Sequence, residues 1–283
     1  MDNNQNLHNI MKKFAVIALA LAMVAIPSCK NQNKKAADSS AKKEISQKEQ
    51  YATEDLKINI ENLIASAKQM KPVPFASKDE GGKISLTTKE KMVKPDYLLE
   101  FSAANDLVTL SQKYRAIAMF AVDEMIAKLY EMPTSEYKST EAKLLLDIND
   151  SALKAFGDAD KSTNEATQAA IAALVDAEYD ANRANFLWET VAASLVEQIY
   201  ILTQNIDKFL PMFDDQTASD ITYNFICVHE GIMSMMEFYP ELESLNSAML
   251  PLYVINAINV DQLKSQLTEL KGEIEAVRYI LLK

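Results

Sequence analysis

The stretch that decides the fold is residues 164–210, NEATQAAIAALVDAEYDANRANFLWETVAASLVEQIYILTQNIDKFL. Leucine, alanine or an aromatic residue recurs along it every seven positions, at Leu174, Ala181, Trp188, Leu195, Leu202 and Phe209. This spacing is typical of a helix that packs against other helices in a coiled-coil-like manner. The stretch contains no proline. It therefore predicts one very long helix over about 164–210, roughly 70 Å in length at ~1.5 Å per residue.

Apolar residues at steps of three and four predict further helices on both sides of this stretch. The clearest stripe is C-terminal and consists of Leu263, Leu267, Leu270, Ile274, Val277 and Leu281. The expected helices cover about 46–70, 96–132, 135–156, 217–239 and 260–282, with a shorter segment over 240–258. Only 5 of the 283 residues are glycine. We therefore predict an all-α fold, an elongated antiparallel helical bundle of about six to seven helices.

A long irregular connection is expected at 71–95, between the first two of these helices. It contains Pro72, Pro74 and Pro95, and it includes the pair Gly81-Gly82. Connections of this length are uncommon inside compact domains, and they are either mobile or functional where they occur. We expect this loop to be the most mobile part of the folded body.

The N-terminal segment has the layout of an export signal. The basic start Met11-Lys12-Lys13 leads into an apolar run over 14–26, and Ser28-Cys29 follows that run. The apolar run has 13 residues, so as a helix it reaches about 20 Å, too short for the ~30 Å core of a bilayer. A positive start with a short apolar run marks a cleaved signal rather than a membrane span.

This layout resembles the signal peptide of bacterial lipoproteins, in the looser form found in Bacteroidetes. In that family the signal is cut before a cysteine that carries the lipid. Ser28 fits the pattern, whereas Ile26 and Pro27 depart from it. The resemblance implies that Cys29 is lipidated and that the protein contacts the membrane through this lipid. Ordinary secretion, with Cys29 as a bystander, is the alternative.

The resemblance also gives the domain organisation. Residues 1–28 are expected to be the signal peptide, with Met11 as a possible true start. Residues 29–45 are polar and are expected to be a flexible tether. Residues 46–283 are expected to form a single helical domain. Lysines rather than acidic residues follow Cys29, and by the same resemblance this favours a periplasm-facing protein of the outer membrane.

Composition narrows the possible partners. The formal net charge is −11, which argues against nucleic acid and against an anionic membrane surface as partners. Beyond Cys29 the only cysteine is Cys227. If Cys29 carries a lipid, no internal disulfide can form, and the fold is held by packing alone.

The sequence carries no signature of a catalytic site. Once residues 1–28 are removed, His229 is the only histidine. This excludes a di-iron bundle with paired Glu-x-x-His motifs and a zinc-protease helix with two histidines. With so few glycines, the chain has no glycine-rich loop to hold a phosphate. We expect no cofactor and no enzymatic activity, and a catalytic site built from acidic residues is a remote alternative.

Two clusters suggest a ligand, and each also has a simpler interpretation. His229, Met233 and Met236 share one face of a predicted helix, and imidazole with thioether sulfurs suits Cu(I). Methionines more often fill an irregular core, and core packing is the expected role of this soft-metal candidate. Trp188, with Tyr179, Phe186 and Tyr200, could line a ligand cleft, but Trp188 fits the seven-residue pattern of a core face. Four nearby acidic residues are expected to form a solvated face: Asp176, Glu178, Asp180 and Glu189.

The leading functional hypothesis is a non-enzymatic, lipid-anchored cell-envelope protein. It would act as a binding or scaffold module that contacts an unknown envelope protein through its helical faces. The alternative is a protein that binds a small or apolar ligand in a cleft between helices. A pocket with convergent polar groups would favour the second hypothesis, and an exposed apolar helix face would favour the first.

Overall fold

The computed structural model describes residues 54–75, 86–159, 164–181 and 183–283. The chain divides into two compact units, Met1–Asn59 and Ile60–Lys283. The expected signal peptide (1–28), the tether (29–45) and Cys29 lie outside the described residues. The second unit contains almost everything discussed below.

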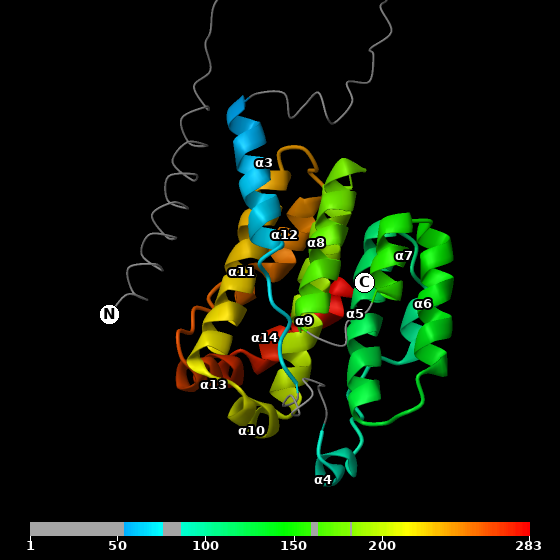
Figure 1. Cartoon of the computed structure of the whole chain (residues 1–283), viewed down its shortest axis with the longest axis vertical. Coiled ribbons are helices and arrows are strands. Elements are labelled where there is room, and N and C mark those ends of the chain that lie inside the picture. The colour runs from blue at the N-terminus through cyan, green and yellow to red at the C-terminus, as the bar shows by residue number, and fades with distance from the viewer. Residues whose placement is uncertain (1–53, 76–85, 160–163, 182) are drawn as a thin grey trace, which may run out of the picture. The chain divides into compact units, whose positions relative to one another are not determined.

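The described residues contain twelve α-helices and three short 3-10 helices, with no strand among them, so the predicted all-α fold is confirmed (Figure 1). None of the described helices combines the length and the apolar character needed to cross a membrane. The elements, with η for 3-10 helices, are α3 (Glu54–Ala67), α4 (Thr88–Lys91), η1 (Phe101–Ala104), α5 (Leu110–Leu129), α6 (Ser135–Ile148), α7 (Ser151–Asp158), α8 (Asn164–Asp180), α9 (Ala184–Gln204), α10 (Ile206–Phe209), η2 (Leu210–Met212), α11 (Asp215–Met235), α12 (Leu242–Met249), η3 (Leu250–Leu252), α13 (Val260–Glu269) and α14 (Lys271–Leu281).

The single helix expected over 164–210 is wrong, because these residues form α8, α9 and α10. Helix α8 ends with a hydrogen bond from the Arg183 amide back to the Glu178 carbonyl, 2.8 Å long. A bond over five residues closes a helix C-terminus. Ala181 belongs to the seven-residue pattern but lies exposed at this break, whereas Trp188, on α9, is fully buried.

Three other expected helices also have different limits. Helix α5 begins at Leu110 rather than near residue 96, because Thr109 caps it and accepts from the Gln112 amide. The segment expected at 135–156 is divided at Asn149, which has φ of 53° and ψ of 48°. Asparagine tolerates this left-handed conformation better than most residues do. The last stripe is divided at Leu270 into α13 and α14.

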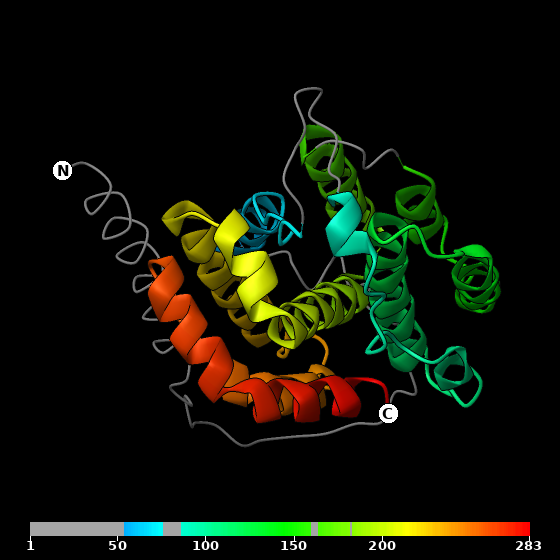
Figure 2. The ribbon, with the colours of Figure 1, turned by 90° about the horizontal axis from the view of Figure 1, so that it is seen from below.

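Helix α9 is the centre of the second unit. It contacts α5, α8, α11, α12, α13 and α14. Figures 1 and 2 show α5, α6 and α7 on one side of α9, with α11, α12 and α13 on the other. A helix surrounded in this way buries most of its surface, and 15 residues of α9 are buried. The C-terminal helices complete the core with five side chains that are at most 1% exposed: Leu263, Leu267, Ile274, Val277 and Leu281.

Helices α9 and α11 are in tight contact at Gly231. A Cβ atom at Gly231 would lie 2.3 Å from the ring of Trp188. The Trp188 side chain is 0% exposed, and its indole N–H donates to the Tyr179 hydroxyl over 3.2 Å. The prediction of core packing for Trp188 is therefore confirmed, and glycine at 231 is what lets the indole fit.

The connection expected to be irregular over 71–95 has firm attachments at its described ends. The Lys71 carbonyl accepts from the side-chain amide of Asn224 over 2.7 Å. The backbone amide of Val73 donates to the side-chain oxygen of Gln198, also over 2.7 Å. The Phe75 ring is buried edge-on against Phe209. Helix α4 lies in the second half of the connection. Residues 76–85 are outside the described residues, so the prediction of mobility there stays a prediction.

Candidate functional site

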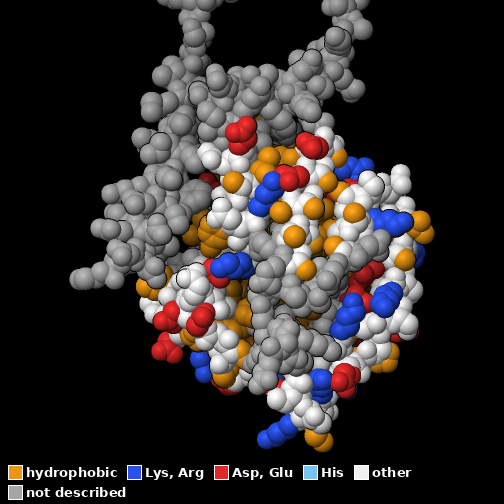
Figure 3. All heavy atoms as spheres, viewed as in Figure 1, with side chains coloured by type: hydrophobic (Ala, Val, Ile, Leu, Met, Phe, Trp, Pro, Cys, Tyr) orange, Lys and Arg blue, Asp and Glu red, His pale blue; other side chains and the backbone are white. Residues whose placement is uncertain are grey.

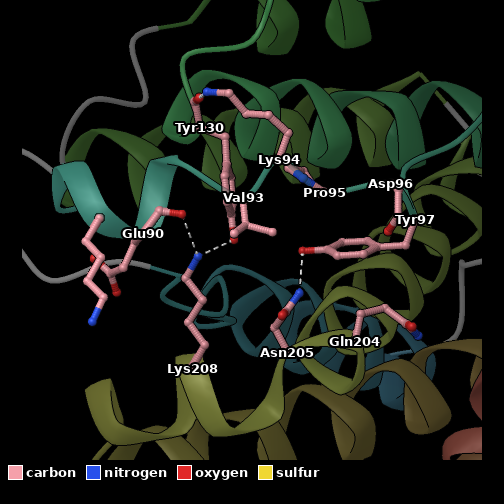
Figure 4. A pocket seen from close by; sticks show the side chains of 11 residues that line it. Glu90, Val93, Lys94, Pro95, Asp96, Tyr97, Tyr130, Gln204, Asn205 and Lys208 are labelled. Carbon is pink, nitrogen blue, oxygen red and sulfur yellow. Dashed lines mark hydrogen bonds between the residues drawn. The ribbon is translucent and has the colours of Figure 1, made fainter.

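A pocket of about 590 Å³ opens at the end of α9 (Figure 4). Three parts of the second unit line it: the segment around α4, the C-terminal end of α5, and the junction of α9 with α10. Its lining residues are Lys89, Glu90, Val93, Lys94, Pro95, Asp96, Tyr97, Tyr130, Gln204, Asn205 and Lys208. Polar side chains from segments far apart in the sequence therefore converge on one space.

The junction of α9 with α10 places two of these side chains. The chain leaves helical geometry at Asn205, with φ of −141° and ψ of 50°, and α10 begins at the next residue. The Asn205 carbonyl accepts from the Lys208 amide over 3.0 Å and from the Phe209 amide over 3.1 Å. This turn directs the Lys208 side chain into the pocket (Figure 4).

The end of α5 forms the opposite wall. Tyr130 is the C-cap residue and is 2% exposed. The chain then reverses through Glu131 at φ of 55°, and the Met132 amide donates back to the Ala127 carbonyl over 2.9 Å. Because this motif ends the helix early, the Tyr130 carbonyl is left over and accepts from the Lys94 ammonium.

Helix α4 supplies the rim of the pocket. Thr87 caps it, and both the amide and the hydroxyl of Thr87 donate to the Glu90 carboxylate, over 2.7 Å and 2.5 Å. These bonds lower the pKa of Glu90, and the charge of Lys208 contributes to the same shift. The Glu90 carboxylate is therefore occupied by the cap.

Three hydrogen bonds cross the pocket. The Lys208 ammonium donates to the Tyr130 hydroxyl over 2.5 Å and to the Glu90 carbonyl over 3.2 Å. The Asn205 amide donates to the Tyr97 hydroxyl over 3.1 Å. Burial raises the pKa of Tyr97, and the neighbouring Tyr130 raises it further. The raised pKa keeps Tyr97 protonated at neutral pH, and each of the two phenols accepts a hydrogen bond from a neighbour.

A buried acid pair, Asp123 and Glu197, is linked to this wall through Leu99, which lies two residues after Tyr97. The Asp123 carboxyl is 0% exposed and accepts from the Leu99 amide over 2.6 Å. Glu197, also 0% exposed, receives two bonds from the Arg278 guanidinium, 2.7 Å and 2.8 Å long. Burial raises the pKa of Asp123 well above its usual value, and the charge of Glu197 adds to the shift. The protonated form of Asp123 is therefore favoured beside the ion pair of Glu197 with Arg278.

This proton makes stability depend on pH. Folded Asp123 holds its proton up to a higher pH than the unfolded chain does, in which the carboxyl has a pKa near 3.8. Folding therefore takes up a proton, so the free energy of unfolding falls as pH rises from 3.8 towards the folded pKa. Glu178, whose pKa burial raises to about 8, acts in the same direction below that pH.

We expect Asp123→Asn to reduce this pH dependence while preserving the fold. The asparagine amide can donate to Glu197, and its oxygen can accept from the Leu99 amide. Between about pH 5 and the folded pKa of Asp123, the slope of unfolding free energy against pH should become shallower by about 1.4 kcal/mol per pH unit, the value for one proton. Denaturant unfolding at a series of pH values measures this, with Glu178→Gln as the control whose effect should be confined to the range below about pH 8. If the unfolding free energies of wild type and Asp123→Asn changed with pH in the same way, the raised pKa of Asp123 would be contradicted.

The expected solvated acidic face is wrong for two of its four residues. Asp176 and Asp180 are exposed, but Glu178 is 1% and Glu189 is 2% exposed. Glu189 accepts from the Arg115 guanidinium over 2.7 Å, and Arg115 also donates to the carbonyl of Leu281. Helix α9 therefore carries two buried glutamates, and each binds an arginine from another helix.

The predicted soft-metal candidates lie on α11, apart from the pocket lining. The imidazole of His229 lies 4.1 Å from the ring of Tyr253, between ring centres. The Met233 side chain is 48% exposed and Met236 is half-buried at the C-cap. No group of three or more His, Cys, Asp or Glu side chains in the described part of the chain is arranged to hold a metal ion. Core packing, the expected role, is wrong for the exposed Met233, and the Cu(I) alternative stays untested.

No family model, curated protein or solved structure matches this chain. The site is therefore defined by its own geometry. Sequence reasoning missed the pocket, because its residues belong to three separate segments. The acid pair did have a signal in the sequence, since Glu197 interrupts an otherwise apolar run in the middle of a helix.

Proposed function

We propose that this chain is a lipid-anchored cell-envelope protein that binds a small polar ligand, without catalysing a reaction. The observation that carries the proposal is the convergence of Lys208, Tyr130, Tyr97 and Asn205 on one pocket. Its volume falls within the range of small-molecule sites, about 300–1,000 Å³. The polar lining favours a hydrogen-bonding ligand over an apolar one.

The proposal of a non-enzymatic role rests on the chemistry of the lining. None of the described residues that line the pocket is a cysteine, histidine, serine or threonine. Cys227 is buried elsewhere, and burial raises the pKa of its thiol to about 12. A thiol with that pKa is not a nucleophile at neutral pH.

The proposed anchor comes from the segment before the body. The short apolar run before Cys29 and the polar residues after it support lipidation at that cysteine. The lysines that follow support a periplasm-facing position at the outer membrane. The tether would leave the pocket free to meet small molecules that diffuse through the envelope.

A second candidate function is docking of another envelope protein, and an apolar surface on α11 favours it. The segment after η3 runs beside α11, where the Thr222 hydroxyl donates to the Ala257 carbonyl over 2.7 Å. Five large apolar side chains on α11, on η3 and on the segment after η3 are between 39% and 59% exposed: Ile226, Met233, Leu250, Val254 and Ile258. Figure 3 also shows apolar side chains along α8 on the face that it displays.

Mass spectrometry of the full-length protein, extracted from its own membranes in mild detergent, tests the proposal. The denatured mass should exceed the mass of the chain cut before Cys29 by that of attached acyl chains. The native mass should in addition include a small molecule that is lost on denaturation. We expect this small molecule because the pocket groups would hold it through several hydrogen bonds.

Two variants serve as controls. Cys29→Ser should lose the acyl chains and leave the membrane fraction. Tyr97→Leu should keep the acyl chains but lose the small molecule. If the native mass shows no small molecule, or if Tyr97→Leu retains it, the pocket is not the binding site.

A further inference from the structure

We infer that the pocket recognises a small organic anion, through a carboxylate or phosphate group seated against Lys208 and the two phenols. This inference rests on the proposed function and specifies the class of ligand. It rests on the charges of the pocket, on its hydrogen-bond donors and on the contacts that hold those donors in place.

The positive charges of the pocket are not neutralised by ion pairs. Lys89, Lys94 and Lys208 line it, and none of the three forms an ion pair with a described residue. The Lys208 ammonium binds only neutral oxygens, the Tyr130 hydroxyl and the Glu90 carbonyl. In a chain of net charge −11, three lysines without ion pairs on one pocket create a local positive potential that favours an anion.

Two carboxylates, those of Glu90 and Asp96, line the same pocket. The carboxylate of Glu90 is held by the amide and the hydroxyl of Thr87. Asp96 is exposed to solvent at the rim, and it forms no ion pair with any of the three lysines. Neither carboxylate therefore takes the place that an anionic ligand would fill beside Lys208.

The pocket also offers hydrogen-bond donors to a ligand. A phenol that accepts a bond through its oxygen still has its own proton to donate. The Tyr130 hydroxyl accepts from Lys208 and the Tyr97 hydroxyl accepts from Asn205. The Tyr97 hydroxyl also interacts with Tyr130, so the donors left for a ligand are the Tyr130 O–H and the third proton of the Lys208 ammonium. A carboxylate or a phosphate is an acceptor that can use both, and such charge-assisted bonds are strong.

Contacts with neighbouring groups hold these donors in place. The Tyr97 carbonyl accepts from the Arg278 guanidinium over 3.4 Å, and the Leu99 amide is bound to Asp123. The ammonium of Lys208 also lies 4.3 Å from the centre of the Tyr130 ring. The donors are thus positioned before the ligand arrives, which lowers the cost of binding.

Nuclear magnetic resonance of the full-length protein in detergent, with ¹³C-labelled lysine and tyrosine, tests the inference. The probes are benzoate and inorganic phosphate as anions, benzamide as the uncharged analogue of benzoate, and benzylamine as a cation, each at about 10 mM. We expect at least one anion to shift the signals of Lys208, Tyr97 and Tyr130, with benzamide and benzylamine at least ~10-fold weaker. Added salt should weaken the effect. A preference for benzoate would identify a carboxylate ligand, and a preference for phosphate would identify a phosphate ligand.

Variants separate the pocket from a general effect of charge. Lys208→Met, which keeps the aliphatic stem, should weaken anion binding about tenfold or more, whereas Lys208→Arg should retain it. Lys271→Met removes an exposed lysine of α14 and should change nothing. Equal shifts with benzamide or benzylamine would overturn the anion inference but leave the pocket as a ligand site. No shift with any probe would overturn the inference, and the native mass would then decide the proposed function independently.

Discussion

Replacing Gly231 with alanine is expected to destabilise the protein by at least ~3 kcal/mol, the upper part of the range for overpacking a core. The added Cβ would lie 2.3 Å from two atoms of the Trp188 ring and 2.4 Å from a third. Since the indole is fully buried, it has no free space into which to move. A loss of this size should lower Tm by roughly 5–10 °C. Thermal unfolding followed by circular dichroism measures it.

The chain offers a matched control for this prediction. Gly272 is also a helical glycine, but a Cβ added there meets nothing within 4 Å. Gly272→Ala should therefore raise stability by about 0.5–1 kcal/mol, through helix propensity alone. Trp188→Phe should be less harmful in the Gly231→Ala background than in wild type, because the smaller ring leaves room. Equal stability of the two alanine variants would contradict the close approach of α9 and α11.

Replacing Arg278 with methionine is the second change with a large expected effect. Arg278 makes two hydrogen bonds to Glu197, and its guanidinium lies 3.9 Å from the Tyr200 ring centre. Methionine keeps the apolar contact but leaves the fully buried Glu197 charge without its partner. Breaking a buried pair from one side costs about 3–5 kcal/mol. Denaturant unfolding at neutral pH measures the loss.

The control is an ion pair that also involves a C-terminal helix. Lys264 binds Asp207 over 2.7 Å, with side chains that are 52% and 82% exposed. Because exposed pairs contribute about 0–1 kcal/mol, Lys264→Met should have little effect. If Arg278→Met were no more harmful than Lys264→Met, Arg278 would not be what stabilises the buried acid pair.

The all-α class and most helix positions could be predicted from apolar spacing alone. The breaks could not, because each depends on contacts that no local pattern contains. Arg183, at the start of α9, binds the Asp150 carboxylate over 2.7 Å, and Asp150 itself caps α7. The seven-residue pattern continues across this break, so it predicts the shared core face correctly but the continuous helix wrongly.

The candidate site was harder to predict than the fold. Lys208 and Tyr130 carry no motif, and they meet only because α9 ends at Asn205 and α5 ends before Glu131. The buried acids had a weak local signal, since a charged residue within an apolar helix face needs a partner. The sequence could not name that partner, because Arg278 lies 81 positions from Glu197.

Hydrogen exchange measured by mass spectrometry tests the central claim, that the pocket at the end of α9 is the ligand site. The full-length protein is compared in detergent with and without the small-molecule fraction of its own cell envelope. Our account predicts slower exchange in 86–99 and 204–210, which carry the pocket residues, and little change along α11. Slower exchange confined to α11 and 250–258, with the pocket unchanged, would contradict it and favour a docking surface.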